Sequence, residues 1–286
     1  MKLTKAIIFS LVLFVTASFA NRSEENNSAE PVANPTVNPS SYQFPTGGGV
    51  GVLYSNGELV NSSGTGVGGL DESVLQSVTL GMGTLGFGHQ VLNGNRIADD
   101  FTVPAGGWDI TTITFYAYQT NETASTITAV NLQIWDGDPS NPGSTVVFGD
   151  DTTNRMISTV NSNILRVTET STGTTTNRQI AASTVDVNIS LPAGTYWLDW
   201  QSDGSGASGP WAPPITINGQ STTGNALQFT GSWTSVTDLS TGTQQGFPFV
   251  INGILPPPPV IPTTNWLGLT LLLMLLSFIS YRKLAK

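Results

Sequence analysis

The residues best suited to chemistry in this sequence are tryptophans set among amides and carboxylates. Trp135 ends a segment in which apolar side chains alternate with amides. Trp197, Asp199 and Gln201 likewise alternate with apolar residues. A period of two places these side chains on the polar face of their strands. An indole beside hydrogen-bonding groups suits a sugar ring, so we predict a carbohydrate-binding face unless loops cover the rings. Trp211, in a loop rich in proline and glycine, either joins this face or caps the fold.

A loop of oxygen-bearing side chains follows Trp135. Asp136, Asp138 and Asn141 lie within six residues of one another. Carboxylate and amide oxygens in a flexible loop are ligands that Ca²⁺ prefers. The alternative is a turn whose Asp and Asn side chains bond to their own backbone. Calcium is the one cofactor that the sequence suggests.

Catalytic residues are scarce. The chain has no cysteine and one histidine, His89, and no G-x-S-x-G motif that would place a serine nucleophile. A glycosidase needs two facing carboxylates, and no glutamate lies at the centre of a strong strand pattern. The formal charge of −9 argues against nucleic-acid binding, which needs a basic patch. We therefore expect a non-catalytic protein, with a secreted carbohydrate-active hydrolase as the alternative.

The elements that must position these residues are short strands. No segment between residues 46 and 255 has helical periodicity, and threonine is abundant, as suits pleated surfaces. The expected strands are 97–103, 109–119, 130–135, 145–149, 157–169, 185–191, 196–201, 213–218, 226–236 and 246–254. They predict an all-β fold, an antiparallel, jelly-roll-like β-sandwich over residues 96–255.

Two turns have the same sequence pattern. Val103-Pro104-Ala105-Gly106 and Leu191-Pro192-Ala193-Gly194 each predict a strand, a tight turn and a second strand. The second copy resembles hairpins of secreted bacterial β-sandwich and jelly-roll modules. Residues 46–95 form a glycine-rich N-terminal part of the same ectodomain, in which Ser55-Asn56-Gly57 predicts a hairpin turn.

The N-terminus has the features of an export signal. Residues 1–20 combine Lys2 and Lys5, an apolar stretch and small residues before a cleavage site between Ala20 and Asn21. Residues 21–45 contain few hydrophobic side chains and predict a disordered linker. The Sec export machinery and signal peptidase are the partners that this end implies.

The C-terminus predicts a membrane anchor. Residues 256–265 form a proline-rich spacer, and residues 266–286 form an apolar helix with a basic tail. Arg282 and Lys283 follow the apolar run and place the extreme C-terminus in the cytoplasm. The helix makes the membrane itself a partner of the chain.

This tail resembles a bacterial sorting signal of the exosortase type, the IPTL-CTERM group. The resemblance is carried by Ile261, Pro262, Thr263, Thr264, Trp266 and Gly268, with the basic Arg282 and Lys283 after the helix. Here Thr264 stands where the family has leucine, and Leu267 separates the tryptophan from the glycine. The resemblance implies processing by an exosortase-type enzyme. A sortase-type signal and a permanent anchor stay open as alternatives.

The charge distribution agrees with export. Five of the ten basic residues belong to the two terminal signals, which leaves five arginines, no lysine and all 19 acidic residues between them, a formal charge of −14. We expect an inner-membrane-anchored precursor, then a protein of the cell surface or extracellular matrix that is adhesive or binds extracellular polysaccharide. No nucleic-acid partner is expected.

Overall fold

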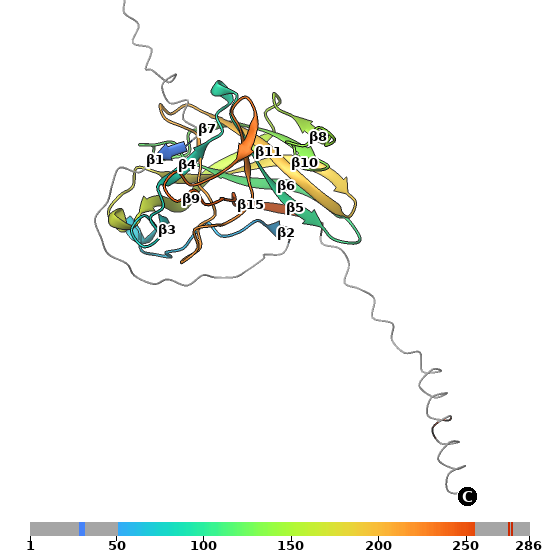
Figure 1. Ribbon diagram of the computed structural model, residues 1–286, viewed down its shortest axis with the longest axis horizontal. Coiled ribbons are helices and arrows are strands. Elements are labelled where there is room, and N and C mark those ends of the chain that lie inside the picture. Colours follow the sequence, from blue (N-terminus) through green and yellow to red (C-terminus); the bar gives the residue numbers. More distant parts are fainter. Residues whose placement is uncertain (1–28, 32–50, 255–273, 275, 277–286) are drawn as a thin grey trace, which may run out of the picture. The chain divides into compact units, whose positions relative to one another are not determined.

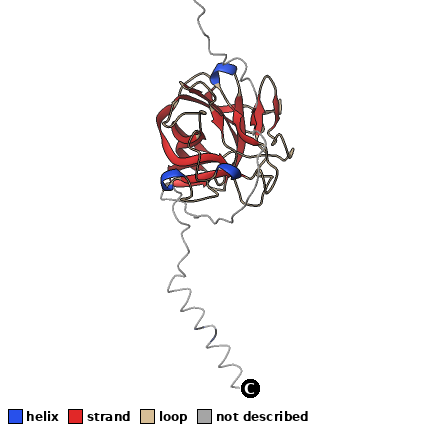
Figure 2. Ribbon diagram, turned by 90° about the vertical axis from the view of Figure 1, so that its left-hand side faces the viewer, coloured by secondary structure: helices blue, strands red, loops and turns tan. Residues whose placement is uncertain are grey.

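The computed structural model describes residues 29–31, 51–254, 274 and 276. The chain divides into two units, Met1–Leu255 and Pro256–Lys286, and nearly all described residues belong to the first. This first unit is all-β, with only short 3₁₀ turns between its strands (Figure 2). The expected signal peptide (1–20), proline-rich spacer (256–265) and, apart from residues 274 and 276, membrane helix (266–286) lie outside the described residues. Among the described residues, no helix has the length and apolar character needed to span a membrane.

The elements of the first unit are β1 (Ala29–Pro31), β2 (Val52–Ser55), η1 (Val67–Gly69), β3 (Asp71–Leu75), β4 (Thr84–Gly88), η2 (Val91–Asn93), β5 (Arg96–Val103), β6 (Trp108–Ala117), β7 (Ile127–Trp135), β8 (Val146–Asp150), β9 (Met156–Thr168), η3 (Glu169–Ser171), β10 (Gln179–Leu191), β11 (Gly194–Gly204), β12 (Trp211–Ala212), β13 (Leu227–Phe229), β14 (Trp233–Ser235) and β15 (Phe249–Ile254). Sheet 1 has the order β2-β15-β6-β10-β9-β3, sheet 2 the order β14-β13-β5-β11-β7-β8, and sheet 3 the order β1-β4-β12 (Figure 1). Neighbouring strands are antiparallel, except that β3 runs parallel to β9.

Sheets 1 and 2 enclose one hydrophobic core, an arrangement consistent with a β-sandwich. Phe115 of β6 stacks on Trp200 of β11 with ring centroids 4.6 Å apart, and Phe249 of β15 meets the same indole edge-on. The alternation along β11 explains why, because Tyr196, Leu198 and Trp200 point inward. Burying each such side chain stabilises the fold by about 1.5–3 kcal/mol. The same alternation turns Trp197 and Asp199 to the other side of sheet 2.

Most expected strands are confirmed. The expected strand 226–236 is instead two short strands, β13 and β14, which pair with each other, and two further sequence predictions are wrong. Residues 213–218 form no strand, because Pro213 and Pro214 lack the amide hydrogens that a ladder needs. The hairpin around Asn56 is also absent. Strand β2 pairs with β15 instead, and the Asn56 side chain donates hydrogen bonds to Asp99 and to the carbonyl of Phe247.

The two Pro-Ala-Gly turns join sheets rather than close hairpins. One links β5 of sheet 2 to β6 of sheet 1, and the other links β10 of sheet 1 to β11 of sheet 2. Because Val103 pairs with Gly194 and Trp108 with Leu191, the two turns lie side by side at one end of the sandwich. Gly107 has a positive φ of 75°, and a Cβ there would approach the carbonyl oxygen of Leu191 within 2.8 Å. The close approach therefore requires glycine.

Residues 29–31 differ from the expectation for the segment 21–45. They form β1 and pair with β4 rather than lacking structure. Strand β4 is paired on its other side by β12, so β4 is the central strand of sheet 3.

Candidate binding face

The outer surface of sheet 2 carries the predicted tryptophans on one side of adjacent strands. Trp197 of β11 lies opposite Trp135 of β7, and Gln201 lies opposite Asn131 four residues further along β11. The two tryptophans thus lie on the same side of sheet 2. We call this surface the aromatic face, and its members are Arg96, Trp135, Asp151, Trp197, Asp199, Phe229 and Trp233.

The three tryptophans of this face differ in accessibility. Trp197 is only 7% exposed, because it packs against Ala98 and Leu227 in a small cluster of its own. Trp135 and Trp233 pack against this cluster from outside and are half-buried. The rings that a ligand reaches are therefore those of Trp135 and Trp233, with Trp197 as their support.

Asp199 connects the two sides of the face. Its Oδ1 accepts a hydrogen bond from Arg96 Nε at 3.1 Å, and its Oδ2 accepts one from the indole Nε1 of Trp135 at 3.1 Å. The side chain is buried, and this burial raises its pKa to about 7 against the opposing effects of Arg96 and Trp135. Asp199 orients the ring and the guanidinium beside it, while both of its oxygens are already occupied.

Arg96 lies against two aromatic rings. Its guanidinium carbon is 4.6 Å from the ring centre of Phe229 and 5.4 Å from that of Trp233. Its Nη1 also donates to Asp151 at 2.9 Å. The guanidinium is therefore held by two carboxylates and two rings, a cation–π arrangement that fixes its plane.

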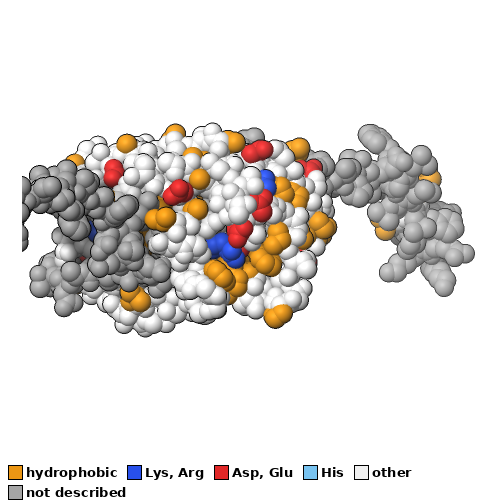
Figure 3. Space-filling view, turned by 90° about the horizontal axis from the view of Figure 1, so that it is seen from above, with side chains coloured by type: hydrophobic (Ala, Val, Ile, Leu, Met, Phe, Trp, Pro, Cys, Tyr) orange, Lys and Arg blue, Asp and Glu red, His pale blue; other side chains and the backbone are white. Residues whose placement is uncertain are grey.

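The segment after β8 crosses the face and covers its amides. The backbone carbonyl of Asp151 accepts hydrogen bonds from Asn131 Nδ2 at 2.8 Å and from Gln201 Nε2. Gln201, which the sequence suggested as a ligand contact, is consequently buried. Figure 3 shows acidic, basic and hydrophobic side chains gathered close together on one surface of the molecule.

The structure separates Trp211 from the aromatic face. Trp211 lies on β12 and packs with Leu59, Tyr118 and Ile180 in another buried cluster. Its indole Nε1 donates to Ser208 Oγ at 3.1 Å. The sequence left two roles open for Trp211, a part of the binding face or a cap on the fold. Its burial in this cluster favours the cap.

Sequence reasoning missed Arg96, Asp151, Phe229 and Trp233. Phe229 joins Arg96 through the pairing of β5 with β13, which connects residues more than 100 positions apart, and the β13–β14 hairpin then adds Trp233. Asp151 arrives with the segment that follows β8. One signal was present in the sequence. Arg96 is one of only five arginines between the terminal signals and immediately precedes an expected strand.

The loop that could bind calcium uses its side chains internally. Asp136 accepts hydrogen bonds from the amide and hydroxyl of Thr145 at 2.6 and 2.7 Å, and these bonds hold its pKa below the usual range. Asp138 and Asn141 each accept a bond from a backbone amide two residues further along. No group of three or more His, Cys, Asp or Glu residues suited to a metal occurs in the described part of the chain. Calcium binding at this loop stays a prediction.

The one histidine is a buried packing residue. His89 Nε2 lies 3.0 Å from Ser202 Oγ, and both side chains are buried. Burial lowers the pKa of His89 to about 4, so the ring is neutral at physiological pH. A serine beside a neutral imidazole resembles a catalytic pair. Both side chains are buried, however, so a substrate has no access to them.

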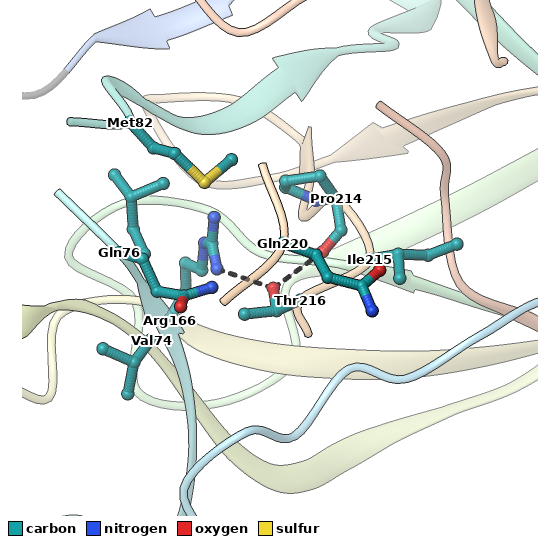
Figure 4. A pocket seen from close by; sticks show the side chains of 9 residues that line it. Val74, Gln76, Met82, Arg166, Pro214, Ile215, Thr216 and Gln220 are labelled. Atoms are coloured by element: carbon teal, nitrogen blue, oxygen red, sulfur yellow. Dashed lines mark hydrogen bonds between the residues drawn. The ribbon is translucent and has the colours of Figure 1, made fainter. Parts of the chain in front are cut away.

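A hollow near the buried Arg166 is also too small for a ligand. Its walls include Gln76, Met82 and Gln220, and Figure 4 shows the guanidinium directed toward Thr216. Arg166 Nη1 donates to Thr216 Oγ1 at 3.1 Å. The hollow's volume of about 10 Å³ leaves room for at most a single water molecule.

No protein-family model, curated protein or solved structure matches this chain. The fold therefore defines the class by itself. The first unit is an all-β protein of mainly antiparallel sheets that pack as in a β-sandwich.

Proposed function

We propose that this chain is an exported, non-catalytic protein of the cell surface or extracellular matrix that binds carbohydrate through the aromatic face. The observation that carries the proposal is the pair of half-buried rings, Trp135 and Trp233, on either side of the ion pair between Arg96 and Asp199. Flat rings pack on the apolar face of a sugar, and fixed polar groups beside them bond to its hydroxyls.

The proposal includes a jelly-roll sandwich. In a jelly roll, two four-stranded sheets contain strands that alternate between the sheets along the chain. The order β5-β11-β7-β8 in sheet 2 fits one such sheet. The order β2-β15-β6-β10 in sheet 1 fits the other, with β9 and β3 as additional strands at its edge. Loops at the ends of such sandwiches are the usual sites of variation, so a binding surface on the sheet itself is a stable platform.

Binding is tested with a glycan array and the full chain purified in detergent. We expect Trp135→Ala and Trp233→Ala each to weaken binding to the best glycan by roughly tenfold, since truncation of a central aromatic contact typically costs more than 1 kcal/mol. Tyr116→Ala is the matched control, because Tyr116 is a partly buried aromatic residue of sheet 1. Unchanged binding in both tryptophan variants would remove the proposed face.

The sorting part of the proposal rests on the sequence of the tail. A mass spectrum of the protein from the envelope and the medium should show an N-terminus at Asn21 and a C-terminus near the motif Ile261-Pro262-Thr263. Replacing these three residues with alanine should leave the precursor in the inner membrane. Alanines in place of the prolines 256–258 serve as the control. An unchanged mass and location of the mature protein after the motif substitution would contradict exosortase-type processing and favour a permanent anchor.

A further inference from the structure

We propose that the ligand of the aromatic face is a cationic saccharide, a glucosamine polymer whose amino groups are free and protonated. This inference rests on the proposed carbohydrate binding and specifies its chemistry. It is carried by the charges that surround the accessible rings and by the way in which the face already holds a cation of its own.

Carboxylates outnumber basic groups on this face. Arg96 pairs with the buried Asp199 and with the exposed Asp151, and Asp100 lies directly opposite Trp197 in the strand pairing. The next ion pair, Arg155 with Asp150 at 3.3 Å, is neutral as a unit. Asp100 and Asp151 alone outnumber the one guanidinium, so an excess of negative charge remains beside the rings even when the buried Asp199 is protonated.

The basic group of this face is not available to an anionic ligand. The Arg96 side chain is only 15% exposed and is bound by two carboxylates, whereas the side chain of Asp151 is 43% exposed. A uronic-acid polymer would therefore meet carboxylates first and be repelled. The formal charge of −14 between the terminal signals acts in the same direction over longer distances.

Arg96 indicates how a bound ammonium group would be held. Its guanidinium contacts the rings of Phe229 and Trp233 and two carboxylates at once. A protonated amino group beside the exposed part of Asp151 and a tryptophan ring would repeat this combination of ion pair and cation–π contact. An acetylated amino group has no charge and would make neither interaction.

The test compares the affinities of three hexasaccharides for the full chain in detergent, measured by isothermal titration calorimetry. These are the glucosamine hexamer, the N-acetylglucosamine hexamer and a galacturonic-acid hexamer. We expect the glucosamine hexamer to bind at least tenfold more tightly than the acetylated one, and the galacturonic-acid hexamer to bind most weakly. Asp100→Asn combined with Asp151→Asn should reduce the preference for the glucosamine hexamer several-fold.

The control variant separates a site from general attraction to an acidic protein. Asp186→Asn removes an exposed carboxylate from β10 of sheet 1 and should leave all three affinities unchanged. An equal loss in Asp186→Asn would overturn the inference, and so would equal affinity for the glucosamine and acetylated hexamers. If the glucosamine and acetylated hexamers bind equally well and Trp135→Ala still weakens both, the preference for a cationic saccharide is wrong but the proposed carbohydrate binding is retained. Failure of all three hexamers and of the glycan array would remove both.

Discussion

At the scale of single residues, Asp199 organises the aromatic face without being exposed on it. Its two oxygens accept hydrogen bonds from Arg96 and Trp135, so one buried carboxylate fixes a ring on one side and a cation on the other. A buried carboxylate is costly unless its oxygens are bonded. The indole Nε1 of Trp135 therefore stabilises the buried Asp199, which an aromatic ring without this donor would not do.

Trp135→Phe tests this role. The change keeps an aromatic ring and removes the only hydrogen that Trp135 donates to Asp199 Oδ2. Leaving a buried acceptor short of a donor should lower the free energy of unfolding by about 1–3 kcal/mol, measured by urea denaturation. It should also raise the pKa of Asp199 further, because a bond that favours the charged form is lost.

Trp233→Phe is the matched control for this experiment. Trp233 contacts Phe229 and Arg96 through its ring, and the same change of ring size there leaves the bonds to Asp199 intact. The two variants should differ in stability by at least about 1 kcal/mol. Equal effects would mean that ring packing, rather than the hydrogen bond, stabilises the face.

At the scale of elements, β8 delivers the segment that covers the face. Gly149 has a positive φ of 79°, and a Cβ at this position would lie 2.0 Å from the carbonyl oxygen of Leu132 on β7. Only glycine allows β8 to pair with β7 and then turn so that the carbonyl of Asp151 reaches the amides of Asn131 and Gln201.

Gly149→Ala should detach β8 from its neighbour. We expect the amides of residues 146–151 to exchange with solvent at least about tenfold faster, corresponding to a local loss of more than about 1 kcal/mol. Hydrogen exchange read by mass spectrometry measures this directly. Gly143→Ala, in the loop before β8, should leave these rates unchanged because its Cβ would meet only an ordinary contact at 3.5 Å. Protection of β8 in the Gly149 variant equal to that of the original chain would disprove the requirement.

Local sequence patterns predicted the strands of this protein better than its site. Alternation separates Trp135 and Trp197 from the core-facing residues of their own strands, since the period of a strand depends only on neighbours in the chain. It could not predict that Leu227 covers Trp197, because that contact depends on the pairing of β13 with β5. The same limit explains Asn56, whose side chain bridges to Asp99 instead of forming the expected turn.

At the scale of the whole molecule, three buried titratable groups link stability to pH. Asp99 points into the sandwich and accepts bonds from Asn56 and from the amide of Phe247, and burial raises its pKa to about 7. Burial likewise raises the pKa of Asp199 to about 7 and lowers that of His89 to about 4. The pKa values of Asp136 and Asp150 are lowered, so these carboxylates titrate at lower pH.

The signs of these shifts give a net prediction between about pH 4.5 and 6. In this range the folded protein keeps protons on Asp99 and Asp199 that the unfolded chain has lost, and the unfolded chain keeps a proton on His89 that the folded protein lacks. The folded state thus binds one proton more, so its stability should fall as pH rises, by about 1.4 kcal/mol per unit.

Asp99→Asn makes this prediction specific. Without Asp99, the raised pKa of Asp199 and the lowered pKa of His89 oppose each other, and the free energy of unfolding should be nearly constant from about pH 4.5 to 6. Urea denaturation at several pH values measures the slope, which is informative even if the variant is less stable throughout. Asp186→Asn, which changes an exposed carboxylate, should keep the slope of the original chain. A slope that persists in Asp99→Asn would mean that the buried carboxylate of the sandwich core is ionised throughout this range, held so by the amide of Phe247 and the side chain of Asn56.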